Sequence, residues 1–202
     1  MLRGCDIKAY VGALVLALLA LPLGVAAQAQ RRPGAVVLGP DSVEVAPEKR
    51  VGAATATYFA KTRQITVQAG PLILRGDVND GLLLAPNFMV AGDHVVAPGW
   101  VDFVFTSYSA KKLYAVRRRL VLTADSKAVL AATPRLVLSK AAADGVTEIL
   151  SQRMTYAQFQ QLAAAEEVQL SLGPTSLPLT KEHLAALRDL RRCVELALSF
   201  KK

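Results

Sequence analysis

Residue types that build most metal and catalytic centres are scarce in this sequence. Its 202 residues include two cysteines, Cys5 and Cys193, and two histidines, His94 and His183. A zinc site made of His and Cys usually needs three or four such ligands held close together. Because these four residues are few and widely separated, the sequence predicts no metal site.

Nucleophile and phosphate-binding motifs are missing as well. The sequence contains no G-x-S-x-G elbow of the kind that presents a catalytic serine. Gly70, Gly76 and Gly81 are spaced like turn residues and do not form a phosphate-binding loop. We therefore expect no cofactor, and the sequence favours a protein that is not an enzyme.

What the sequence does contain at its N-terminus is the pattern of a secretory signal peptide. Arg3 and Lys8 precede an apolar run, Val11–Leu21, and small residues follow that run. A cleavage site of the A-x-A type fits after Ala27 or after Ala29. The first 29 residues are thus predicted to be removed on export.

Export predicts a secreted or periplasmic protein with no transmembrane segment after cleavage. The alternative is an uncleaved membrane anchor, because the apolar stretch has about 17 residues, the lower end of the range that spans a bilayer. Pro22 and Gly24 near the end of this stretch favour cleavage. The mature chain then keeps Cys193 as its one thiol, so no internal disulfide is possible. On the last predicted helix, this thiol is expected to be buried and inert.

The remaining length suits a single domain. Residues 30–53 are rich in polar and turn-forming residues, which predicts a partly flexible lead-in. Residues 54–202 are expected to form one domain whose stability comes from its core.

Alternation of apolar and polar residues dominates the first part of this domain. Ile65, Val67 and Ala69 alternate with polar neighbours, which is typical of a strand with one buried face. Turn signals recur about every 8 to 14 residues, a spacing that favours an antiparallel meander. The predicted strands include 64–69, 72–74, 82–84, 100–106, 113–123, 127–132, 135–140 and 146–153.

The last part of the chain predicts two helices. Thr155 and Gln158 form a capping box before the first of them. Thr180 caps the second and longer helix, predicted over residues 181–199. His183 stands where a capping box would have Glu or Gln, and we expect it to be solvated. The expected fold is α+β: an antiparallel sheet of about seven to nine strands, as a meander or a sandwich, with two C-terminal helices packed on it.

His94 is the best candidate for a catalytic side chain. Asp93 precedes it and Asp102 lies in the next predicted strand, and either carboxylate could orient the imidazole. No nucleophile stands at a recognisable spacing, and residues 91–94 also fit an ordinary turn. We expect no catalytic site here, although an envelope hydrolase using His94 stays open as an alternative.

A basic cluster is the strongest candidate for binding, in a chain whose net charge is +8. On the predicted strand, Arg117 and Arg119 share one face, while Arg118 shares the other with apolar residues. If that second face is the core, Arg118 must pair, snorkel or mark an edge. A nearby tyrosine could add an aromatic contact to an anionic partner. The candidate binding residues are Lys111, Lys112, Tyr114, Arg117 and Arg119.

Three functions remain open from the sequence. The favoured one is an exported, non-catalytic binding module with a protein or an anionic envelope component as partner. The second is an envelope protein that binds an anionic surface or lipid through the basic cluster, and the third is the hydrolase. The other charges are dispersed along the chain, so we expect no nucleic-acid ligand.

Overall fold

A computed structural model describes residues 47–77, 80–143 and 145–200. The predicted signal peptide and most of the lead-in lie outside these residues. The sheet already begins within the predicted lead-in, because the strand β1 starts at Glu48 and pairs with β2.

A large antiparallel sheet of eight strands forms the base of the fold. Its strand order is β1-β2-β3-β5-β6-β10-β9, and β4 pairs with the beginning of β5. Because neighbouring strands are mostly consecutive in the chain, short turns suffice to connect them. The strands are β1 (Glu48–Val51), β2 (Ala54–Phe59), β3 (Gln64–Ala69), β4 (Leu72–Gly76), β5 (Gly81–Ala91), β6 (Trp100–Ser109), β9 (Arg135–Ala142) and β10 (Gly145–Thr155).

A second, four-stranded sheet and two helices complete the described residues. The order of the small sheet is β12-β11-β7-β8. The predicted α+β fold with two C-terminal helices is confirmed. The described residues form twelve strands in two sheets, where about seven to nine strands were expected, and the predicted strand 127–132 belongs to the small sheet. The elements are β7 (Leu120–Ala124), β8 (Lys127–Ala132), α2 (Tyr156–Ala164), β11 (Val168–Leu172), β12 (Thr175–Pro178) and α3 (Lys181–Glu195).

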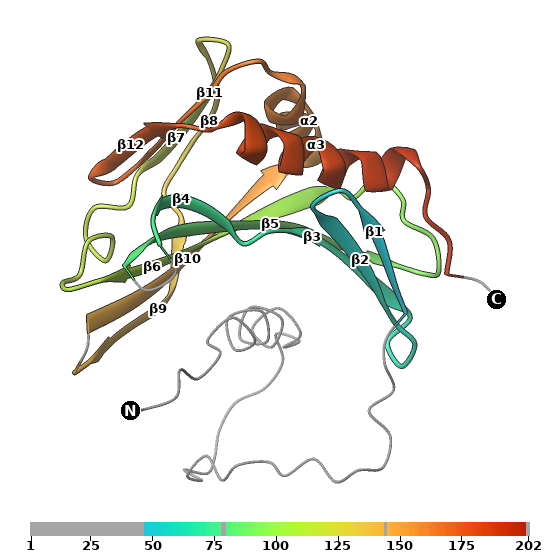
Figure 1. Cartoon of the computed structure of the whole chain (residues 1–202), viewed down its shortest axis with the longest axis horizontal. Helices are drawn as coiled ribbons and strands as arrows, with labels where there is room; N and C mark the ends of the chain where they lie inside the picture. The colour runs from blue at the N-terminus through green and yellow to red at the C-terminus, as the bar shows by residue number, and fades with distance from the viewer. Residues whose placement is uncertain (1–46, 78–79, 144, 201–202) are drawn as a thin grey trace, which may run out of the picture. The chain divides into compact units, whose positions relative to one another are not determined.

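The main core lies on one face of the large sheet. Figure 1 shows α2, α3 and the small sheet on the same side of this curved sheet. Helix α3 contacts β1, β2 and β3, whereas α2 contacts β6, β10 and the small sheet. The fully buried aromatic residues Phe88, Phe103, Phe105 and Phe159 belong to this core. Each such side chain stabilises the fold by roughly 1.5 to 3 kcal/mol through burial.

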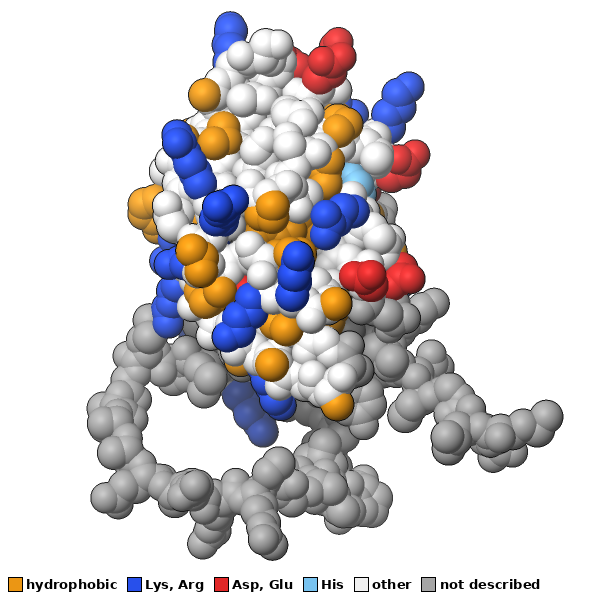
Figure 2. Space-filling view, turned by 90° about the vertical axis from the view of Figure 1, so that its left-hand side faces the viewer, with side chains coloured by type: hydrophobic (Ala, Val, Ile, Leu, Met, Phe, Trp, Pro, Cys, Tyr) orange, Lys and Arg blue, Asp and Glu red, His pale blue; other side chains and the backbone are white. Residues whose placement is uncertain are grey.

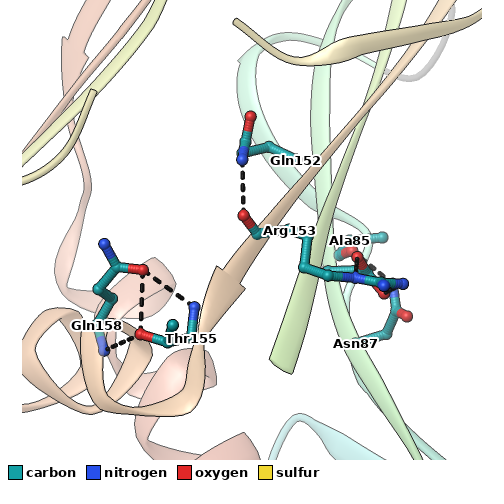
Figure 3. A network of polar contacts seen from close by, with 7 residues as sticks. Ala85, Asn87, Gln152, Arg153, Thr155 and Gln158 are labelled. Atoms are coloured by element: carbon teal, nitrogen blue, oxygen red, sulfur yellow. Dashed lines mark hydrogen bonds and ion pairs between the residues drawn. The ribbon is translucent and has the colours of Figure 1, made fainter. Parts of the chain in front are cut away.

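The capping box of α2 forms as predicted. The backbone amide of Gln158 donates to the Thr155 hydroxyl, and the Thr155 amide donates to Gln158 Oε1 (Figure 3). The side-chain amide of Gln158 also donates to the Val129 carbonyl, at 3.1 Å. The cap therefore fixes the helix start and ties it to β8.

Helix α3 is joined to its neighbours by polar contacts along its length. Asp189 Oδ2 accepts a hydrogen bond from the Ala53 amide, in the turn between β1 and β2, at 2.9 Å. Gly52 in this turn has φ of +55°, and a Cβ there would lie 2.0 Å from Asp189 Oδ2, so any other residue would strain the turn and displace this carboxylate. Arg188 donates to the Ala165 carbonyl at the end of α2, at 2.8 Å.

His183 forms a capping box in which the imidazole takes the place of a Glu or Gln side chain. The Thr180 amide donates to His183 Nδ1 at 3.1 Å. His183 Nε2 lies 2.9 Å from the Ile73 carbonyl in β4. Because Nδ1 accepts, Nε2 must carry the proton and donate, which defines one neutral tautomer. The expectation of a solvated ring is wrong, since His183 is only 8% exposed.

Replacing His183 with Ala should lower the free energy of unfolding by about 1 to 3 kcal/mol. The substitution removes the acceptor for the Thr180 amide and the donor to the Ile73 carbonyl. Gln at the same position can restore the capping box, so His183→Gln should lose less stability. Urea unfolding of both variants checks this, and equal stability of His183→Ala and the parent protein would contradict the assigned role.

Candidate functional site

The basic cluster lies on the connection between the two sheets, residues 110–119, which we call the basic connector. The predicted strand over 113–123 is wrong for its first part, because β7 begins at Leu120 and residues 111–119 are bends, turns and irregular structure. The amides of a strand need acceptors on a neighbouring strand, whereas two amides of this segment donate to the side chain of Glu148. The connector leaves four basic side chains exposed: Lys111, Lys112, Arg117 and Arg119.

A buried glutamate holds the connector from below. Glu148, in β10, is fully buried, and its Oε2 accepts the Leu113 amide at 2.7 Å and the Tyr114 amide at 3.0 Å. Hydrogen bonds to a carboxylate are stronger than those between neutral groups. These two bonds satisfy buried amides that no strand pairing satisfies, and they fix the middle of the connector.

Glu148 belongs to a polar row across three neighbouring strands. It pairs with Ser107 of β6 on one side and with Ser139 of β9 on the other. Directly opposed residues of neighbouring strands project to the same face, which here is the core face. Glu148 Oε1 and both serine hydroxyls are buried and lack hydrogen-bond partners among the described residues. Burying polar atoms without hydrogen-bond partners lowers the stability of the fold. The two hydrogen bonds to Glu148 Oε2 offset part of this cost.

Tyr114 is a buried anchor and not a surface residue. Its side chain is fully buried and its hydroxyl lies 2.8 Å from the hydroxyl of Thr175, at the start of β12. The expectation that Tyr114 belongs to the exposed binding patch is therefore wrong. The turn between β11 and β12 also packs on the connector, because the Gly173 amide donates to the Arg119 carbonyl at 2.9 Å. A Cβ at Gly173 would lie 2.1 Å from the Arg117 carbonyl, so the approach requires glycine.

Arg118 turns back onto the protein while its two neighbours remain exposed. Its guanidinium donates to the Ala115 carbonyl at 2.6 Å and to the Pro134 carbonyl at 3.0 Å. Of the three options that the sequence left for this arginine, pairing, snorkelling or marking an edge, the structure shows pairing, with carbonyl groups. Arg118 thus braces the connector, while Arg117 and Arg119 remain available to a ligand.

Two basic residues of β9, Arg135 and Lys140, project to the face of the large sheet opposite Glu148. Arg135 follows Pro134, which Arg118 contacts, and Lys140 of β9 is level with Thr147 and Tyr108 in the large sheet. Figure 2 shows the side of the molecule that carries the connector: Lys and Arg side chains are spread over it, and acidic side chains lie near its margins. This side should carry a positive electrostatic potential.

The candidate catalytic residues Asp93 and His94 lie beside the C-terminal tail and not on the connector. His94 Nδ1 lies 2.5 Å from Asp93 Oδ1, and the His94 side chain is 42% exposed. The C-terminal tail passes beside them, since the Phe200 amide donates to the Asp93 carbonyl and an isolated bridge pairs His94 with Ser199. The bridge places opposite His94 a serine that the sequence did not single out.

Asp102, the other carboxylate that the sequence singled out, binds Arg153. Arg153 Nε lies 3.0 Å from Asp102 Oδ1, and a second guanidinium nitrogen lies 3.2 Å from Oδ2. This hydrogen-bonded pair raises the pKa of Arg153. Arg153 and the neighbouring Asn87 lie on the face of the large sheet opposite the helices (Figure 3).

Cys193 is buried in the core side of α3, as the sequence predicts. Burial, together with the negative charge of Asp189, raises the pKa of its thiol to about 11. The thiolate form is therefore rare near neutral pH, and Cys193 is a poor nucleophile and a poor metal ligand.

Within residues 47–77, 80–143 and 145–200, no group of three or more His, Cys, Asp or Glu side chains is arranged so that it could hold a metal ion. Nor does any helix in this part of the chain combine the length and apolar character needed to cross a membrane. Comparisons with protein-family models, curated proteins and solved structures give no match. The geometry of the described residues therefore carries the functional argument.

Replacing Glu148 with Ala should lower the free energy of unfolding by about 2 to 4 kcal/mol, because two buried amides lose their acceptor. Glu148→Gln keeps a carbonyl oxygen at this position and should cost less. Hydrogen exchange at the Leu113 and Tyr114 amides should accelerate in the alanine variant. Unchanged protection of these amides would show that Glu148 does not hold the connector.

Cys193 should react with a thiol reagent only when the protein unfolds. In a chain that carries Cys5→Ser, labelling at pH 8 is expected to be slow in buffer and fast in urea, since the thiol is buried and its pKa is about 11. Labelling in buffer at the rate of the unfolded chain would contradict this burial.

Proposed function

We propose that this protein is an exported, non-catalytic binding module and that its ligand is an anionic surface. The observation that carries the proposal is the basic connector. Four of its cationic side chains are exposed, while contacts from Glu148 and Arg118 hold its backbone. Export itself rests on the signal-peptide pattern of the sequence.

The arrangement suits an extended anionic partner better than a small anion. The exposed cations are distributed along the connector and do not converge on one buried point. Attraction of this kind acts over about 10 Å at an ionic strength of 0.1 M and weakens as salt is added. The hydrolase alternative has less support, because it rests on one surface Asp–His pair.

Neutralising the connector should strongly weaken binding to anionic vesicles. A variant with Gln at Lys111, Lys112, Arg117 and Arg119 loses four charges, each contributing about 1 kcal/mol near an anionic membrane. Affinity should therefore fall on the order of a thousandfold. Co-sedimentation with vesicles of equal parts phosphatidylglycerol and phosphatidylcholine measures this. Binding of the parent protein should also weaken when salt rises from about 0.05 M to about 0.5 M.

The matched control removes four exposed charges elsewhere. Gln at Lys61, Lys127, Lys181 and Arg192 lowers the net charge by the same amount and leaves the connector intact. This control should retain most of the affinity. Equal losses in the two variants would mean that net charge, and not the connector, governs binding.

A further inference from the structure

Val116 is the apolar residue that protrudes from the basic connector. It is 91% exposed, the highest value among the exposed large apolar side chains of the described residues, including Val96 at 54%. Arg117 follows it directly and is itself exposed. Isolated exposed apolar residues are common on protein surfaces, so exposure by itself assigns no role. The backbone around Val116 provides the second observation.

The chain is held on both sides of Val116. On its N-terminal side, the amides of Leu113 and Tyr114 donate to Glu148, and the Ala115 carbonyl accepts from Arg118. On its C-terminal side, the Arg119 carbonyl accepts from Gly173. These contacts hold the backbone in a conformation in which an apolar side chain, next to the exposed Arg117, points into water. A loop that merely linked two sheets could bury this valine or carry a polar residue.

We propose that Val116 inserts into the interfacial region of an anionic lipid bilayer while the cations of the connector bind the headgroups. This inference rests on the proposed function and names the surface as a membrane. A lipid interface offers both an apolar layer and negative charge, and stable attachment generally combines these two signals. A soluble polyanion offers charge alone and gives Val116 nothing to contact.

The prearranged backbone lowers the cost of this insertion. A flexible loop would lose conformational entropy when it settled on the membrane, whereas the connector is already held by its contacts with Glu148, Arg118 and Gly173. The long side chains of Lys111, Lys112, Arg117 and Arg119 can still adjust to the headgroups. One inserted valine should then contribute about a fivefold to tenfold gain in affinity.

The test uses tryptophan fluorescence. The chain has a single tryptophan, Trp100, so Trp100→Phe gives a background without this fluorophore. In that background, Val116→Trp should show a blue shift and increased emission when vesicles of equal parts phosphatidylglycerol and phosphatidylcholine are added. Val96→Trp, at another exposed valine, is the matched control and should show no shift. In the natural background, Val116→Ser should bind these vesicles about fivefold to tenfold more weakly and bind dextran sulfate unchanged.

The outcomes separate insertion from the proposed function. If the vesicles bind in a salt-dependent manner but the Val116→Trp variant shows no blue shift and Val116→Ser binds normally, insertion is overturned and anionic-surface binding stands. If the protein binds dextran sulfate but not the vesicles, the membrane assignment is overturned. If it binds neither, both proposals are overturned.

Discussion

Two backbone amides, those of Leu113 and Tyr114, donate to one buried carboxylate oxygen of Glu148, and the basic connector depends on this contact. The chain must leave the large sheet at Ser109 and enter the small sheet at Leu120. Between these points its amides pass over the core without a neighbouring strand. A carboxylate from β10 supplies the acceptors that a strand would otherwise supply. The connector can therefore pack on the core with one side and expose charged side chains on the other.

Side chains of α3 also form hydrogen bonds with backbone groups of neighbouring elements. His183, Arg188 and Asp189 each bind a backbone group of a different element, in β4, at the end of α2 and in the turn between β1 and β2. The apolar face of the helix drives its packing, and these polar contacts select one position for it. The C-terminal tail adds an aromatic contact with the large sheet, because Phe200 stacks on Tyr58 of β2, with ring centroids 5.7 Å apart. The large sheet is thereby held under its helix at several points.

A rigid backbone that carries mobile cationic side chains has a functional consequence. In the proposed function, the scaffold determines where the charges are displayed, and the flexible Lys and Arg side chains would accommodate the spacing of the anions. Such a surface recognises charge density and an interface more than the shape of one ligand.

The sequence by itself determined the fold class, the positions of most strands, both helix starts and the basic cluster. These features depend on local periodicity and on capping chemistry, which neighbouring residues encode. It could not place Glu148, because Ile149 and Leu150 put apolar residues on both faces of β10 and a glutamate is normally assigned to solvent. It also mistook the connector for a strand and Tyr114 for a surface residue. Only the tertiary structure decided these points, because each depends on a partner distant in sequence: Glu148 for the connector amides, Thr175 for Tyr114 and Ile73 for His183.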